Sequence, residues 1–209
     1  MMKAKINSTV TLGRQLGSGG YTVGKMIASA LGLAFFDKEL LYHAAQESGL
    51  CEEVFENADE KTSTGLSRIL NVQNPFGLAF FDPMNTPLSR DRIFNIQSEV
   101  IRKLAQQQPC LFIGRCADYV LRDVPGLRSL FIHAPLSVRI SNIAESKGIT
   151  HKEAESLIVR GDKNRAAYYN YFTNKEWGRA ESYHFSLDSG LLGLERCAEA
   201  AVDLIKNYW

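Results

Sequence analysis

Short apolar segments alternate with helical patterns along most of the chain. Five segments combine high apolar content with lengths typical of buried strands, namely residues 10–12, 33–37, 110–114, 127–134 and 183–188. Apolar residues elsewhere recur at intervals of three and four, which predicts helices over residues 21–31, 38–48, 91–107, 136–171 and from 194 onward. Alternation of strands and helices predicts an α/β fold with a parallel sheet covered on both faces.

Residues 58–89 depart from this alternation. Three prolines and two glycines interrupt any helical or strand period there: Pro75, Pro83, Pro87, Gly65 and Gly77. We predict an irregular insertion with at most one short helix.

Composition and charge narrow the class of protein. The chain has 209 residues, 45% of them hydrophobic, which suffices for one α/β domain with insertions or two small domains. Its 24 basic and 23 acidic residues argue against binding to a nucleic-acid polymer or a membrane surface. We recognise no targeting segment and no apolar run of membrane length, and we expect a cytoplasmic protein. The cysteines lack C-x-x-C spacing, so we expect reduced thiols and no zinc site; they are Cys51, Cys110, Cys116 and Cys197.

Candidate chemistry lies at the ends of the predicted strands. Arg14, Asp37, Arg115 and His133 end or follow four of them. In a parallel sheet the carboxyl ends meet at one edge, where ligands bind. Each of these residues is equally well explained as an ordinary loop residue, and His133 as a core histidine, but their combination with a glycine loop favours a site.

The glycine loop is the segment "GRQLGSGGYT", between the first strand and the first helix. Glycines let backbone N–H groups approach an anion, and the helix N-terminus adds partial positive charge. A tight strand-to-helix turn would also favour glycine. The phosphate-binding motif G-x-x-x-x-G-K-S/T is incomplete, because Gly20 and Tyr21 stand where its lysine and hydroxyl are expected. We expect Arg14, or Lys25 one turn into the helix, to supply the missing charge.

Four segments carry a family resemblance. Together they resemble the cytidylate kinase-like family, and they occur in the order typical of that family. The first segment runs from "GRQLGSGGYT" to "AAQESGL", and the others are "PCLFIGRCADYVL", "LFIHAPLSVRI" and "DKNRAAYYNYFTNKEWGRAESYHFSLDSGLLGLE". The resemblance covers nearly the whole chain and is weakest over residues 58–92. It implies ATP and Mg²⁺ as cofactors and small nucleotides as substrates.

The resemblance implies three groups of site residues. The glycine loop would bind the ATP phosphates, with the Thr22 hydroxyl available to the magnesium ion; its residues are Arg14, Gly17, Ser18, Gly19, Gly20, Tyr21 and Thr22. The segment "DKELLYH" and the "GR" that follows the third strand would hold the acceptor; the residues are Asp37, Tyr42, His43 and Arg115. Glu39 and His43 replace a glycine and an arginine of the family pattern, and these changes bear on the identity of the acceptor.

The third group lies in a basic segment. Residues 139–179 hold eight Lys or Arg and five Asp or Glu, a surplus of three positive charges. By resemblance this segment is a lid, in which Arg139 and Arg165 neutralise charge on the migrating phosphoryl group and Asp162 orients an arginine or a backbone group. The aromatic residues near it are expected to pack the lid onto the body; they are Tyr168, Tyr169, Tyr171, Phe172 and Trp177.

The expected fold is a parallel-sheet P-loop NTPase core of nucleoside monophosphate kinase type. One domain over residues 1–209 would have its core at 1–37, 106–138 and 181–209, an acceptor-binding insertion at about 38–105 and a helical lid at about 139–180. The resemblance implies ATP-dependent phosphorylation of a small acceptor, with a pyrimidine monophosphate such as CMP favoured. Two alternatives remain open: a non-catalytic nucleotide-binding or regulatory protein, and a kinase for another small acceptor.

Overall fold

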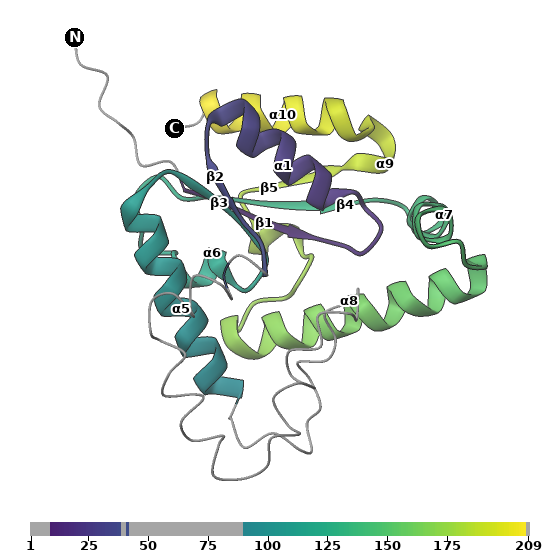
Figure 1. Ribbon diagram of the computed structural model, residues 1–209, viewed down its shortest axis with the longest axis horizontal. Coiled ribbons are helices and arrows are strands. Elements are labelled where there is room, and N and C mark those ends of the chain that lie inside the picture. Colours follow the sequence, from purple (N-terminus) through teal and green to yellow (C-terminus); the bar gives the residue numbers. More distant parts are fainter. Residues whose placement is uncertain (1–8, 39–40, 42–89, 208–209) are drawn as a thin grey trace. The chain divides into compact units, whose positions relative to one another are not determined.

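The computed structural model describes residues 9–38, 41 and 90–207 (Figure 1). Residues 1–38 and 101–209 form one compact unit, and residues 39–100 form another. Most of the helix predicted over 38–48 and all of the insertion predicted over 58–89 lie outside the described residues. In the part that is described, no helix has the length and apolar character needed to cross a membrane.

Five strands form one parallel sheet in the order β2-β3-β1-β4-β5. The strands are β1 (Thr9–Arg14), β2 (Ala34–Phe36), β3 (Cys110–Ile113), β4 (Arg128–His133) and β5 (Phe185–Asp188). The central strand β1 pairs with β3 through Leu12 and Ile113 and with β4 through Leu12 and Leu130. The predicted α/β fold with a parallel sheet is therefore confirmed.

Helices connect and flank these strands. They are α1 (Gly20–Leu31), α5 (Arg90–Gln107), α6 (Ala117–Val120), α7 (Leu136–Lys147), α8 (His151–Thr173), α9 (Ser189–Leu192) and α10 (Leu194–Asn207), with a 3-10 turn η2 (Ala180–Ser182). The helical region predicted over residues 136–171 consists of two helices. Gly148 ends α7 in the left-handed conformation, and Thr150 begins α8 with a capping box to Glu153.

One face of the sheet packs against α1 and α10, which lie together over it (Figure 1). Side chains alternate along each strand, so Val10 and Leu12 of β1 join this core while Thr9 and Thr11 face the other way. From α1, Val23 and Ile27 enter the same core at a spacing of four residues. This packing fixes the start of α1 at the carboxyl end of β1.

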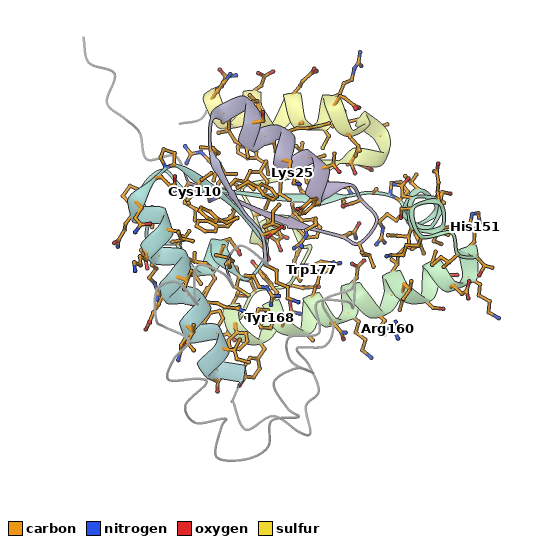
Figure 2. The ribbon with its side chains drawn as sticks, viewed as in Figure 1. Lys25, Cys110, His151, Arg160, Tyr168 and Trp177 are labelled. Carbon is orange, nitrogen blue, oxygen red and sulfur yellow. The ribbon has the colours of Figure 1, made fainter. Side chains whose placement is uncertain are left out.

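The other face carries an aromatic cluster that reaches the end of α8. The Phe131 ring lies 4.8 Å from that of Tyr183 and 5.3 Å from that of Trp177, which Figure 2 shows between the sheet and α8. Tyr169 of α8 is 5% exposed, packs on Tyr183, and donates a hydrogen bond of 2.7 Å to Asp118. Tyr169 and Trp177 thus pack this region onto the body, as predicted, whereas Tyr171 is 61% exposed, contrary to the prediction.

Candidate active site

The glycine loop crosses the carboxyl edge of the sheet between β1 and α1. Gln15 continues the pairing of β1 by donating from its backbone N–H to the Ile132 carbonyl. The Ser18 hydroxyl donates to the Gln15 carbonyl at 2.9 Å and accepts from the backbone N–H of Gly20 at 3.3 Å. Gly20 is the first residue of α1, so the loop leads directly into the helix N-terminus. This is the geometry in which backbone N–H groups and the helix dipole bind a phosphate.

Two loop positions strongly favour glycine. Gly17 and Gly19 have φ values of 82° and 70°, in the left-handed region. A Cβ atom on Gly17 would lie 2.7 Å from the Arg139 carbonyl, and one on Gly19 would collide with the Leu194 side chain. The loop is therefore tightly enclosed by α7 and α10.

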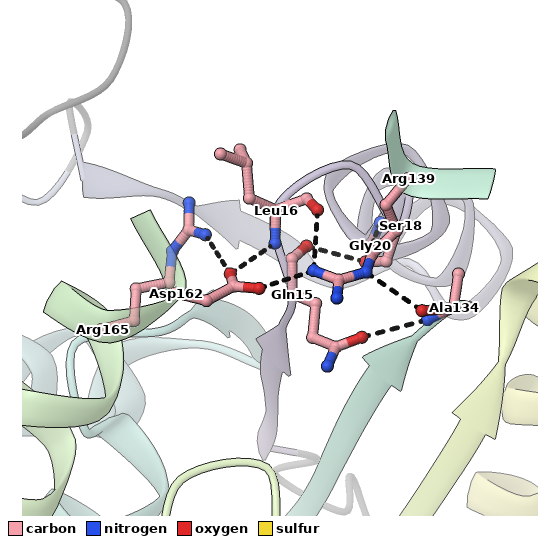
Figure 3. A network of polar contacts seen from close by, with 8 residues as sticks. All are labelled: Gln15, Leu16, Ser18, Gly20, Ala134, Arg139, Asp162 and Arg165. Atoms are coloured by element: carbon pink, nitrogen blue, oxygen red, sulfur yellow. Dashed lines mark hydrogen bonds and ion pairs between the residues drawn. The ribbon is translucent and has the colours of Figure 1, made fainter. Parts of the chain in front are cut away.

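Asp162 of α8 joins the loop to two arginines (Figure 3). One carboxylate oxygen accepts from the Leu16 backbone N–H at 2.8 Å and from Arg165 at 3.2 Å. The other oxygen lies 2.6 Å from Nη1 of Arg139. The Arg139 side chain is 10% exposed and also donates to the carbonyls of Ala134 and Leu16. The ion pairs and the Leu16 contact hold α7, α8 and the loop in one arrangement.

Three further side chains secure the loop. The Gln15 side-chain carbonyl accepts from the Ala134 N–H at 3.2 Å, and Asn142 of α7 donates to the Gly17 carbonyl at 2.9 Å. The Ser189 hydroxyl lies 2.6 Å from the Ser18 carbonyl and 2.9 Å from that of His133, so its proton serves both. Sequence reasoning missed these residues. Of the three, only Asn142 could have been found from the sequence, because it lies three residues after Arg139 and therefore on the same face of the predicted helix.

Three arginines from different elements carry positive charge to this edge of the sheet: Arg14 of β1, Arg115 after β3 and Arg165 of α8. Burial, followed by the charges of Arg165 and Arg115, lowers the pKa of Arg14 to about 9, although Asp37 and Asp162 oppose this. Burial likewise lowers the pKa of Arg165, although the Asp162 carboxylate opposes this. Like charges brought this close repel one another, and an anion bound among them would relieve the repulsion.

The turn after β3 has an uncommon backbone. Gly114, Arg115 and Cys116 have φ values of 70°, 60° and 55°, so three successive residues are left-handed. For the two residues with side chains this conformation costs on the order of 1–2 kcal/mol each. Arg115 hydrogen-bonds Tyr168 of α8, whose pKa is raised above its ordinary value by burial despite that bond. Backbone strain of this kind is often found at functional sites, and here it sets the direction of Arg115.

The first turns of α1 face the end of β2. The Tyr21 hydroxyl donates to the Asp37 carboxylate at 3.0 Å. Lys25, on the same helix, places its ammonium 4.8 Å from the centre of the Tyr21 ring and 5.9 Å from that of Phe35. Lys25 is thus held over aromatic rings, whereas the Arg14 side chain passes from the end of β1 beside Gly20 to Gly114.

The remaining expected site residues are placed as follows. Thr22 is exposed on the first turn of α1, and Asp37 is partly buried at the end of β2. Tyr42 and His43 lie outside the described residues. Within residues 9–38, 41 and 90–207, no group of three or more His, Cys, Asp or Glu side chains could hold a metal ion. His133, expected to be a core residue, is 38% exposed in its side chain and lies 4.0 Å from Asp188.

Comparisons with known proteins agree with this architecture. The profile of the cytidylate kinase-like family matches residues 9–191. No curated protein matches the chain significantly. Among solved structures, an uncharacterized protein from Eubacterium ventriosum ATCC 27560 is similar at a TM-score of 0.72 and 22% identity, covering 95% of this chain and 98% of its own.

Two kinases share the fold more distantly. Shikimate kinase from Acinetobacter baumannii, in complex with shikimate, has a TM-score of 0.53 and 14% identity, and the match covers 98% of this chain and 96% of that one. A gluconokinase from Sinorhizobium meliloti 1021 has a TM-score of 0.54 and 16% identity, with 98% and 95% covered. At these identities the similarity establishes the fold alone.

Proposed function

Because the chain belongs to the cytidylate kinase-like family, we propose that it transfers a phosphoryl group from ATP to a small acceptor, a nucleoside monophosphate such as CMP being the first candidate. The observation that carries this proposal is the convergence of Arg14, Arg115 and Arg165 beside the glycine loop. Phosphoryl transfer depends on positioning and on neutralising the charge of the moving group. Arginine suits both, since its planar fork binds phosphate oxygens in pairs.

The glycine loop and the N-terminus of α1 would hold the ATP phosphates. The backbone N–H groups after Gly17 lead into the helix, and the enclosure of Gly17 and Gly19 keeps the loop in this conformation. Mg²⁺ usually binds proteins through one or two oxygen ligands and completes its shell with phosphates and water. The exposed Thr22 hydroxyl fits that mode, and the ion would neutralise charge on the phosphates.

The acceptor would lie between the ends of β2 and β3. Asp37 and Arg115 are delivered there by neighbouring strands, since β2 pairs with β3. Arg115 would contact an acidic group of the acceptor. Tyr42 and His43, which the family resemblance assigns to the acceptor, lie outside the described residues. Glu39 and His43 depart from the pattern of nucleotide-accepting relatives, which favours a non-nucleotide acceptor as the second candidate. Shikimate and gluconate are suitable tests of that class, because two kinases of similar fold are named for them.

A panel assay tests the proposal. The purified protein with ATP and Mg²⁺ would be assayed for ADP release with nucleoside monophosphates, shikimate and gluconate as acceptors. Turnover on CMP or another monophosphate is expected. Turnover restricted to a non-nucleotide would establish the second candidate. ATP binding with no turnover on any acceptor would instead support a regulatory nucleotide-binding protein.

Arg139 and Arg165, which the family resemblance assigns to a lid, have different surroundings and therefore different proposed roles. Arg139 is engaged by Asp162 and by two backbone carbonyls, which supports a positioning role for it. The Arg165 side chain is 29% exposed, and its charge helps to lower the pKa of Arg14. Burial, opposed by Asp162 and joined by the charge of Arg115, lowers the pKa of Arg165 itself. Arg165 is therefore the better candidate for contact with the migrating phosphoryl group.

Replacing Arg165 with alanine should lower kcat about a hundredfold, as expected when one oriented charged donor is lost. ATP affinity should change much less, because the contact is made mainly in the transition state. Steady-state kinetics and calorimetric titration with ATP would separate the two effects. Arg160→Ala is the matched control, since Arg160 lies on the same helix but is exposed and points away from the sheet (Figure 2). Equal rates for the Arg165 variant and wild type would exclude this role.

A further inference from the structure

The cation missing from the phosphate-binding motif has a counterpart elsewhere in the same motif. Aligning Gly19 with the second glycine of G-x-x-x-x-G-K-S/T puts the first glycine at Arg14 and the lysine at Gly20. The glycine and the cation have thus exchanged positions. We propose that Arg14 gives the ATP phosphates the positive charge that the lysine gives them in the ordinary motif. The motif would then keep its cation, at position 14 in place of position 20. This inference rests on the proposed use of ATP.

The two positions compete for one space. A Cβ atom on Gly20 would lie 2.5 Å from Cβ of Arg14, 3.1 Å from its Cγ and 3.2 Å from Cβ of Ile132. A Cβ atom is fixed by the backbone, so no change of side-chain rotamer can relieve a contact between two Cβ atoms. A side chain at position 20 is therefore incompatible with Arg14 as it stands, and glycine at 20 is the condition for arginine at 14.

A second glycine makes room for the other end of the Arg14 side chain. A Cβ atom on Gly114 would lie 2.5 Å from Nη1 of Arg14. The side chain thus passes from the base of the loop, beside the first residue of α1, to the turn after β3. Its guanidinium lies along the edge where the proposed phosphate and acceptor sites meet.

The charges around Arg14 favour an anionic ligand. Its charged neighbours are the cations Arg165 and Arg115 and the carboxylates Asp37 and Asp162. Asp37 accepts from Tyr21, and Asp162 from Leu16, Arg139 and Arg165. In the part of the chain that the structure describes, no group accepts a hydrogen bond from the Arg14 guanidinium. A partly buried cation in this setting is suited to a phosphate.

The alternative source of charge is less well placed. Lys25 is exposed, and its ammonium stacks over the rings of Tyr21 and Phe35. It also lies more than one turn into α1, beyond the N-terminal N–H groups that would bind phosphate.

The test is an exchange experiment with four variants: Arg14→Gly, Gly20→Lys, the double variant Arg14→Gly/Gly20→Lys, and Arg14→Met. Affinity for Mg·ATP would be measured by calorimetry and turnover by ADP release. Arg14→Met keeps the aliphatic stem and removes the charge, so it should remain folded and bind ATP at least about tenfold more weakly, since charged hydrogen bonds are the strong ones. Arg14→Gly should lose affinity similarly, and Gly20→Lys should lose it through the steric conflict.

The double variant gives the decisive result. It restores the ordinary motif and should bind ATP with an affinity within about tenfold of wild type, better than either single variant. Such a non-additive effect is expected when two positions share one role. Lys25→Met, the control, should bind ATP like wild type. Wild-type affinity in Arg14→Met, or a double variant no better than both singles, would overturn the inference.

The outcome separates this inference from the proposed activity. If wild type binds ATP but phosphorylates no acceptor, the proposed transfer fails while the affinity comparison still decides the role of Arg14. If wild type binds no ATP, both proposals are overturned.

Discussion

Replacing Asp162 with alanine is expected to lower the free energy of unfolding by about 3 kcal/mol, because removal of one partner from a buried ion pair leaves the other charge uncompensated. That charge is Arg139, whose side chain is 10% exposed and whose Nη1 lies 2.6 Å from the carboxylate. The Leu16 backbone N–H loses its acceptor as well. Arg165 loses the contact that directs it. The same change should therefore lower kcat/KM about a hundredfold, the effect of displacing a site by about an ångström.

Urea denaturation and steady-state kinetics would measure these two effects. Asp123→Ala is the matched control, since Asp123 also lies beside an arginine, at 3.6 Å, but is 87% exposed. Surface pairs contribute less than about 1 kcal/mol, so this control should resemble wild type. Asp162→Asn should fall between wild type and the alanine variant, because an amide oxygen can still accept from Leu16. If Asp162→Ala proves as stable as the control, the network does not anchor the loop.

Replacing Gly17 with alanine should destabilise the protein by about 3 kcal/mol and abolish measurable ATP binding. Two costs add to this loss of stability. The first is the left-handed backbone at φ 82°, which disfavours a side chain by about 1–2 kcal/mol. The new Cβ would also lie 2.7 Å from the Arg139 carbonyl and 3.0 Å from Ile143, and such overpacking costs about 1–3 kcal/mol. Since the obstructing atom is backbone, the loop itself must shift away from the position that would bind phosphate.

Gly148→Ala separates the two costs. Gly148 has a φ of 63°, and a Cβ atom there would meet nothing within 4 Å. This control should lose only about 1 kcal/mol, the backbone cost, and should bind ATP normally. Equal stability losses in the two variants would mean that the loop accommodates the methyl group without moving, which contradicts the tight enclosure inferred here.

The order of strands and helices could be predicted from local patterns. Short apolar segments identified all five strands, and apolar residues at intervals of three and four identified the long flanking helices, because each element must bury one face. The short helices α6 and α9 were not predicted. The observed boundaries of the strands and long helices differ from the predicted ones by a few residues, and the helical region predicted after residue 136 consists of two helices. The capping pair Thr150 and Glu153 was visible in the sequence as T-x-x-E, and it marks the start of the second helix.

Part of the candidate site was also accessible from sequence. Parallel strands deliver their carboxyl ends to one edge, so Arg14, Asp37 and Arg115 were expected near each other once the strands were recognised. The contact between Asp162 and Arg165 follows from their spacing of three residues on a helix. Tyr42 and His43 remain predictions outside the described residues.

The sequence alone therefore determined what depends on neighbours along the chain: the elements, the sheet class, the glycine loop and the edge where charged residues gather. Only the tertiary structure decided which distant groups meet. The carboxylate of Asp162 bonds the Leu16 N–H across 146 residues, and the side chains of Arg14 and a residue at position 20 would compete for one space. Such relations depend on how α7 and α8 return to the loop and on the direction of each side chain, and no local period of apolar residues encodes either.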